Sequence, residues 1–146
     1  MKAYTSISQS ITLGKFLSIE SADMRYGYIA PYDYYYRMYD GGYDKVPYPK
    51  DFLVKNPNFS ADEYDGELPA WSLAALMNIF PKEEGSCTSL SFGYYDVEGN
   101  YTSSWLCCYE KEGESTDEYI IETITADNPI DCCVAMILKL KDLKLL

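Results

Sequence analysis

The chain has 146 residues, the usual size of one domain, and 47% of them are hydrophobic, which is typical of a globular protein. Its formal charge of −11 at pH 7 repels nucleic acid and anionic membranes, because both bind surfaces rich in Lys and Arg. The sequence therefore predicts a single globular domain over residues 1–146 that binds neither nucleic acid nor a membrane directly.

A short helix is predicted near the start of the chain. Ser6 and Gln9 have the spacing of a capping box, in which each side chain accepts a hydrogen bond from the other residue's backbone amide. Ile7 and Ile11 follow at helical spacing, so we expect the helix over about residues 6–18.

A tyrosine-rich hairpin and a loop are predicted next. Tyrosines and β-formers dominate residues 22–40, and the turn-like segment 30–33 divides them into strands near 23–30 and 34–40. Prolines, an Asn-Pro pair and an acidic run then predict a long Pro/Asp-rich surface loop around 41–68, the least ordered part of the domain.

The segment 69–81 predicts a short buried helix. Pro69 suits its first turn, Ser72 is an alternative N-cap, and Pro81 ends it. Its expected buried face consists of Leu73, Leu76, Met77 and Phe80.

A second hairpin and a further strand are predicted in the second half of the chain. The hairpin strands are expected over Thr88–Val97 and Tyr101–Glu110, and Glu98-Gly99-Asn100 forms the turn between them. A third strand is expected over Tyr119–Thr125, after a charged connector.

The last helix has the clearest signals. Asn128 is a natural N-cap, Pro129 takes the first helical position, and Asp131 lies near the positive end of the helix dipole. Its expected buried face consists of Ile130, Cys133, Val134, Ile137 and Leu140. The predicted order is thus α-β-β-α-β-β-β-α. It indicates an α+β fold in which one antiparallel sheet of about five strands packs against helices.

The five cysteines are Cys87 and two adjacent pairs, 107–108 and 132–133, and no C-x-x-C spacing occurs. Adjacent cysteines point to opposite faces of a strand, or about 100° apart on a helix, so neither pair is arranged to chelate a metal ion. The odd number, together with the lack of a continuous apolar stretch at the N-terminus, predicts free, buried thiols in a cytoplasmic protein.

No motif in the chain predicts chemistry. Without histidine there is no Ser-His-Asp or Cys-His pair, and the phosphate-binding, dinucleotide-binding and nucleophile-elbow motifs are absent from the sequence. The acidic run Asp62–Glu67 does not have the spacing of an EF-hand. We therefore predict no catalytic, cofactor-binding or metal-binding residue. A small-ligand or metal-assisted enzyme that uses carboxylates and tyrosines is kept as an alternative.

Nine of the sixteen tyrosines fall between Tyr26 and Tyr48. Alternate residues of a strand face outward, and exposed tyrosines are common in protein interfaces. The predicted interaction surface consists of Tyr32, Tyr34, Tyr36, Tyr43 and Tyr48. The favoured interpretation is a non-enzymatic protein that binds another protein.

The charge distribution suggests an alternative. Residues 82–127 contain 11 acidic residues against Lys82 and Lys111. Such a segment would suit an acidic nucleic-acid mimic that inhibits a host protein by occupying its basic groove. Most of these acids fall at predicted turns, which scatters them, so we rank mimicry below ordinary protein binding.

Three segments carry a resemblance to a family: ESADM over 20–24, WSLAAL over 71–76 and DNPIDCCVAMI over 127–137. In these the chain resembles small uncharacterised proteins of gut Bacteroides-type bacteria and their phages or mobile elements. The resemblance implies an accessory role linked to a phage or plasmid. It implies no activity, so no functional residue is transferred from it.

Overall fold

The computed structural model describes residues 2–29, 32–34, 37–39, 42–43, 47–49, 67–113, 115 and 118–146. These residues form helices and antiparallel strands, so the predicted α+β class is confirmed. No helix among them is long and apolar enough to cross a membrane. The chain divides into two compact units, Tyr4–Ala75 and Leu76–Leu146 with Met1–Ala3, which are described separately below. The single domain over 1–146 stays a prediction.

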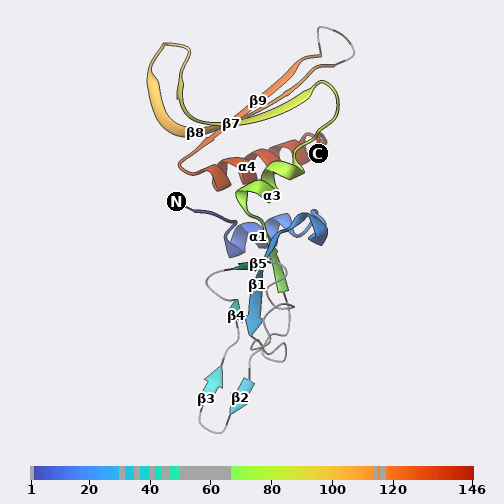
Figure 1. Cartoon of the computed structure of the whole chain (residues 1–146), viewed down its shortest axis with the longest axis vertical. Coiled ribbons are helices and arrows are strands. Elements are labelled where there is room, and N and C mark those ends of the chain that lie inside the picture. Colours follow the sequence, from blue (N-terminus) through green and yellow to red (C-terminus); the bar gives the residue numbers. More distant parts are fainter. Residues whose placement is uncertain are drawn as a thin grey trace. The chain divides into compact units, whose positions relative to one another are not determined.

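The described residues of the unit Tyr4–Ala75 include two helical segments before the first strand and two antiparallel sheets. The helical segments are α1 (Ile7–Leu13) and a 3-10 turn (Ile19–Ser21). The strands are β1 (Met24–Ile29), β2 (Tyr32–Tyr34), β3 (Arg37–Tyr39), β4 (Gly42–Tyr43), β5 (Tyr48–Pro49) and β6 (Glu67–Ala70). β1 pairs with β4, β5 and β6, whereas β2 and β3 form a separate hairpin (Figure 1).

The predicted pairing of 23–30 with 34–40 is therefore wrong. The predicted turn 30–33 is also wrong, because Tyr32 and Asp33 lie in β2; Ala30 and Pro31 lie outside the described residues. Local β-propensity marks strands but does not select their partners, and β1 finds its partners far along the chain.

The predicted loop over 41–68 is wrong in part, because β4, β5 and the start of β6 fall within it. Pro49 pairs with Met24 at the end of the two-residue strand β5, and proline is tolerated at such strand ends. The rest of the predicted loop lies outside the described residues.

Helix α1 confirms the capping box. The Gln9 backbone N–H donates to the Ser6 hydroxyl at 3.2 Å, and the Ser6 N–H donates to the Gln9 side chain at 3.0 Å. The helix ends at Leu13, earlier than the predicted residue 18, because Gly14 follows it and glycine disfavours helix continuation. Ile11 lies within the helix and is 44% exposed.

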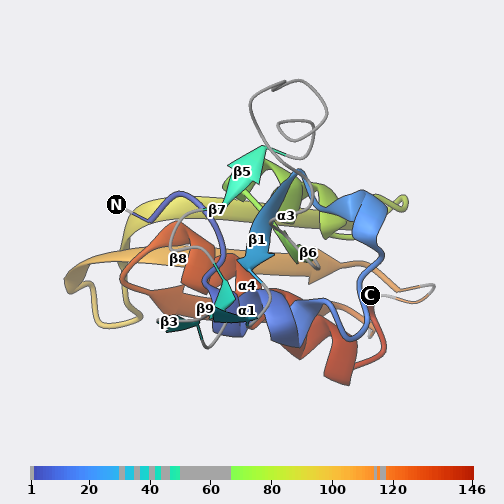
Figure 2. The same ribbon diagram turned by 90° about the horizontal axis from the view of Figure 1, so that it is seen from below.

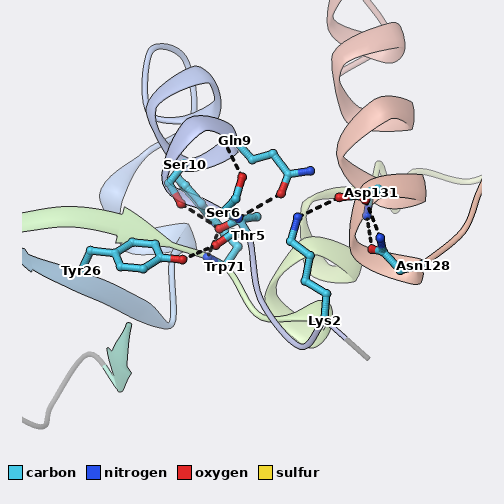
Figure 3. A network of polar contacts seen from close by, with 9 residues as sticks. All are labelled: Lys2, Thr5, Ser6, Gln9, Ser10, Tyr26, Trp71, Asn128 and Asp131. Carbon is cyan, nitrogen blue, oxygen red and sulfur yellow. Dashed lines mark hydrogen bonds and ion pairs between the residues drawn. The ribbon is translucent and has the colours of Figure 1, made fainter. Parts of the chain in front are cut away.

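A buried polar network fixes the N-terminal segment of this unit (Figure 3). The Thr5 hydroxyl accepts a hydrogen bond from the Trp71 backbone N–H at 3.0 Å and lies 2.8 Å from the Ser10 hydroxyl. The Tyr26 hydroxyl donates to the Thr5 carbonyl at 2.7 Å. All four side chains are at most 2% exposed, so each hydrogen bond is made away from water.

Helix α3 (Leu73–Ile79) starts later than predicted. Pro69 lies in β6 opposite Arg25 rather than in the first helical turn, and the helix is capped instead by Ser72, whose hydroxyl accepts from the Ala75 N–H at 3.3 Å. Of the predicted face, Leu76 and Phe80 are buried and Leu73 and Met77 are half-buried.

The unit that contains Leu76–Leu146 has a three-stranded antiparallel sheet with a helix on one face (Figures 1 and 2). Its strands are β7 (Ser86–Tyr95), β8 (Tyr101–Lys111) and β9 (Ile120–Ala126), and its helix is α4 (Pro129–Asp142). The predicted second hairpin, third strand and last helix are confirmed. The predicted single five-stranded sheet is wrong, because the strands that the structure describes belong to three separate sheets.

Helix α4 is capped and buried as predicted. The Asp131 backbone N–H donates to the Asn128 side-chain carbonyl at 2.9 Å, and the Asp131 carboxylate pairs with Lys2 at 2.8 Å. The five residues of the predicted face are all buried: Ile130, Cys133, Val134, Ile137 and Leu140.

Asn128→Ala is expected to lower the free energy of unfolding by about 1 kcal/mol, because it removes this cap. Urea denaturation followed by circular dichroism measures the change. Asp127→Ala, at the exposed neighbouring position, is the control and should have little effect. Equal effects of the two substitutions would contradict a capping role for Asn128.

Candidate protein-binding surface

One face of the β7–β8–β9 sheet is only partly covered by α4. In the register of β7 and β8, Leu90 lies opposite Cys107 and Phe92 lies opposite Trp105, so all four share one face. Cys107 is completely buried under the helix, whereas Phe92 is 58% exposed. The turn end of the hairpin extends beyond α4 (Figures 1 and 2), which leaves the apolar face uncovered there.

A β-bulge opposite Gly93 lies between this face and a second pair of aromatic residues at the turn end of the hairpin. The register shifts between Phe92 and Tyr94, and Gly93 has a positive φ of 78°. One residue of β7 stands here opposite two of β8, so the extra residue lies on β8. Tyr95 is three residues beyond Phe92 and faces away from it, because side chains alternate along a strand. Tyr95 pairs with Tyr101, so this second pair lies on the other face of the sheet.

Glycine is required at the bulge for a second reason. A Cβ atom at position 93 would lie 2.2 Å from the Tyr101 hydroxyl oxygen, so the Tyr101 side chain lies directly against the Gly93 backbone. Any larger residue would displace Tyr101 as well as strain the backbone.

The hairpin-end surface consists of these two pairs, Phe92 with Trp105 and Tyr95 with Tyr101, which lie on the two faces of the hairpin beside its turn. The rings of Phe92 and Trp105 lie edge to face at 5.4 Å between centroids, and those of Tyr95 and Tyr101 at 5.3 Å. Tyr95 and Tyr101 are 73% and 56% exposed, and Trp105 is half-buried. Val97, in the adjoining turn, is fully exposed.

The turn beside this surface is ordered by a carboxylate. Asp96 accepts hydrogen bonds from the backbone N–H groups of Asn100 and Glu98, both at 2.9 Å, and from the Asn100 side chain at 3.1 Å. These bonds, foremost the one from the Asn100 backbone, lower the pKa of Asp96. Asp96 is therefore ionised at neutral pH. With the exposed Glu98 it makes the turn acidic.

The tyrosines of the predicted interaction surface are distributed differently. Tyr32 and Tyr34 lie on β2, Tyr43 lies on β4 opposite Tyr28, and Tyr48 lies on β5 opposite Arg25; Tyr36 lies outside the described residues. β2 belongs to a different sheet from β4 and β5, so the backbone does not bring the four described tyrosines onto one sheet. Their role as an interaction surface stays a prediction.

The hairpin-end residues were not among those that the sequence predicted to bind a partner. The available signal was the concentration of aromatic residues on both sides of the predicted turn 98–100, with Phe92 and Tyr95 before it and Tyr101 and Trp105 after it. This signal does not show which of the four pair across the hairpin, because the register depends on the bulge.

The five cysteines are free thiols, as predicted, but they are not all buried: Cys107, Cys132 and Cys133 are buried, Cys108 is half-buried and Cys87 is exposed. Burial raises the pKa of Cys132 to about 11. A hydrogen bond with Cys133, followed by burial, raises the pKa of Cys107 well above its ordinary value. In the described part of the chain, no three His, Cys, Asp or Glu residues are grouped so as to hold a metal ion.

We expect one thiol of the native protein to react quickly with a disulfide reagent at pH 8, and all five to react in urea. The reacting species is the thiolate, and burial, followed by the charge of Glu110, raises the pKa of Cys108. The exposed Cys87 should therefore supply the fast phase, and Cys87→Ser should remove it. A fast phase that persists in this variant would contradict the assignment.

Comparison with known proteins gives no relative: no protein-family model, no curated protein and no solved structure matches the chain.

Proposed function

We propose that this chain is a non-enzymatic protein-binding domain and that the hairpin-end surface is its binding site. The observation that carries the proposal is the exposure of Phe92, Tyr95 and Tyr101, each more than half exposed, at the turn end of one hairpin. Exposed aromatic groups of this kind are typical of protein interfaces, where aromatic residues contribute much of the binding energy.

The arrangement of the surface also favours binding. Its rings are held by two edge-to-face contacts, by the fit of Tyr101 on Gly93 and by the hydrogen-bonded turn at Asp96. A surface that is ordered before binding loses less conformational entropy when a partner binds. These contacts are formed within the hairpin itself.

The positions of the acids disfavour nucleic-acid mimicry. Asp96 and Glu98 lie at the turn, whereas Glu83, Glu84 and Glu112 lie at the other end of the hairpin. The ten-residue strand β7 separates the two groups by about 30 Å at roughly 3.3 Å per residue. A mimic needs closely and evenly spaced charges, so we rank it below protein binding.

We further propose a cytoplasmic setting linked to a phage or mobile element, in line with the family resemblance of the segments 20–24, 71–76 and 127–137. The partner would then be a protein of the host cell or of the element.

Site-specific photocrosslinking tests the binding surface. A photoreactive phenylalanine analogue at Val97 should crosslink a discrete protein in cells that naturally express the chain. Phe92→Ser/Tyr101→Ser should reduce this product by about tenfold or more, because loss of two interface aromatics removes hot-spot contacts. Tyr119→Ser/Ile121→Ser, which changes exposed residues at the other end of the sheet, is the matched control. Equal crosslinking by both folded variants would contradict the proposal.

A further inference from the structure

We propose that the hairpin-end surface binds a cationic protein segment, with arginine side chains stacked on the exposed rings of Tyr95 and Tyr101 and paired with the carboxylate of Glu98. The inference rests on the proposed function and specifies the chemistry of the partner.

The first observation is the charge around the surface. Asp96 and Glu98 are exposed, and neither forms an ion pair with a described Lys or Arg. No Lys or Arg occurs between residues 83 and 110, and the next one, Lys111, pairs with Glu83 at 2.9 Å at the far end of the hairpin. The turn therefore presents negative charge that no described Lys or Arg of the chain neutralises, and it is complementary to a cationic partner.

The second observation is the presentation of the rings. Tyr95 and Tyr101 contact each other edge to face, with an interplanar angle of 60°, and both are more than half exposed. The π-face of such a ring attracts cations, and the planar guanidinium of arginine stacks on it better than the ammonium of lysine. Exposed rings beside carboxylates thus favour arginine in two ways: the rings stack on the guanidinium, and the carboxylates pair with its charge.

The same two observations disfavour other occupants. Bases of single-stranded nucleic acid also stack on aromatic rings, but Asp96 and Glu98 repel the phosphates. A second copy of the chain also has a net charge of −11, so the two copies would repel each other. Their acidic turns would lie near each other in such a contact.

The test uses fluorescent peptides of equal length and equal charge, one with arginine and one with lysine at every charged position, and a glutamate peptide as the negative control. Fluorescence anisotropy should show binding of both cationic peptides, with about two- to fivefold higher affinity for arginine. Added salt should weaken both interactions, because the charges are exposed.

Three variants separate the contributions. Tyr95→Leu/Tyr101→Leu keeps apolar side chains but removes the ring faces, so it should abolish the preference for arginine. Glu98→Gln should lower the affinity for both cationic peptides equally. Glu112→Gln, at the other end of the hairpin, should change the affinity for neither. Asp96 is left intact because it orders the turn.

Each alternative outcome overturns the inference in a distinguishable way. Equal binding of both peptides, unchanged in the Tyr95/Tyr101 variant, would mean attraction by net charge alone. Self-association that depends on these tyrosines, measured by analytical ultracentrifugation, would assign the surface to a second copy. If neither cationic peptide binds while photocrosslinking at Val97 still requires Phe92 and Tyr101, the cationic partner is wrong and the proposed function stands. If that crosslinking fails as well, both are wrong.

Discussion

Replacing Ile137 with alanine is expected to lower the free energy of unfolding by roughly 2–5 kcal/mol, because it opens a cavity in a well-packed core. Ile137 is completely buried on the face of α4 that packs against the sheet. Its neighbours along that face, Cys133 and Leu140, are also completely buried, which leaves little freedom for the site to collapse around the missing atoms.

Urea denaturation followed by far-UV circular dichroism gives the free energy for the Ile137→Ala variant. Leu143→Ala provides the matched control, since Leu143 is an exposed aliphatic residue that caps the end of α4. This substitution should lower the free energy of unfolding by well under half as much. Small and equal effects of the two substitutions would mean that α4 is not packed on the sheet through this face.

A second large effect is expected in the unit Tyr4–Ala75. Thr5→Val keeps the shape of the side chain but removes a hydroxyl that serves both the Trp71 backbone N–H and the Ser10 hydroxyl (Figure 3). Both groups would then be buried without this partner. Each buried polar group that loses its hydrogen bond costs about 1–3 kcal/mol, so the free energy of unfolding should fall by roughly 2–5 kcal/mol.

Two further variants make this result specific to the network. Thr12→Val is the control, because the Thr12 hydroxyl donates to the Ser8 carbonyl on the exposed side of α1. This hydrogen bond should contribute little to the free energy of unfolding. Thr5→Val/Ser10→Ala should recover part of the lost stability, because it removes one of the two orphaned groups. A Thr5→Val variant as stable as the Thr12→Val control would show that the network does not stabilise the protein.

The elements that the sequence predicted correctly depend on residues close together in the chain. The capping box of Ser6 and Gln9 and the cap of Asn128 are each completed within three residues. The β7–β8 hairpin follows from a short turn between two strand-forming segments, and the buried face of α4 follows from helical spacing. Each pattern has one local structure that satisfies its hydrogen bonds or buries its apolar side chains, so no long-range information was needed.

The sheets and the candidate site were decided by tertiary structure. Strand propensity is a property of a segment, but pairing is a property of two segments, and β1 pairs with β6 some forty residues further along the chain. The hairpin-end surface depends on two further facts that no local pattern contains. The bulge opposite Gly93 brings Tyr95 into register with Tyr101, and α4 covers Cys107 but not the turn end of the sheet. Composition supplied the aromatic side chains, whereas the register and the extent of the helix decided that they pair across the hairpin and are exposed.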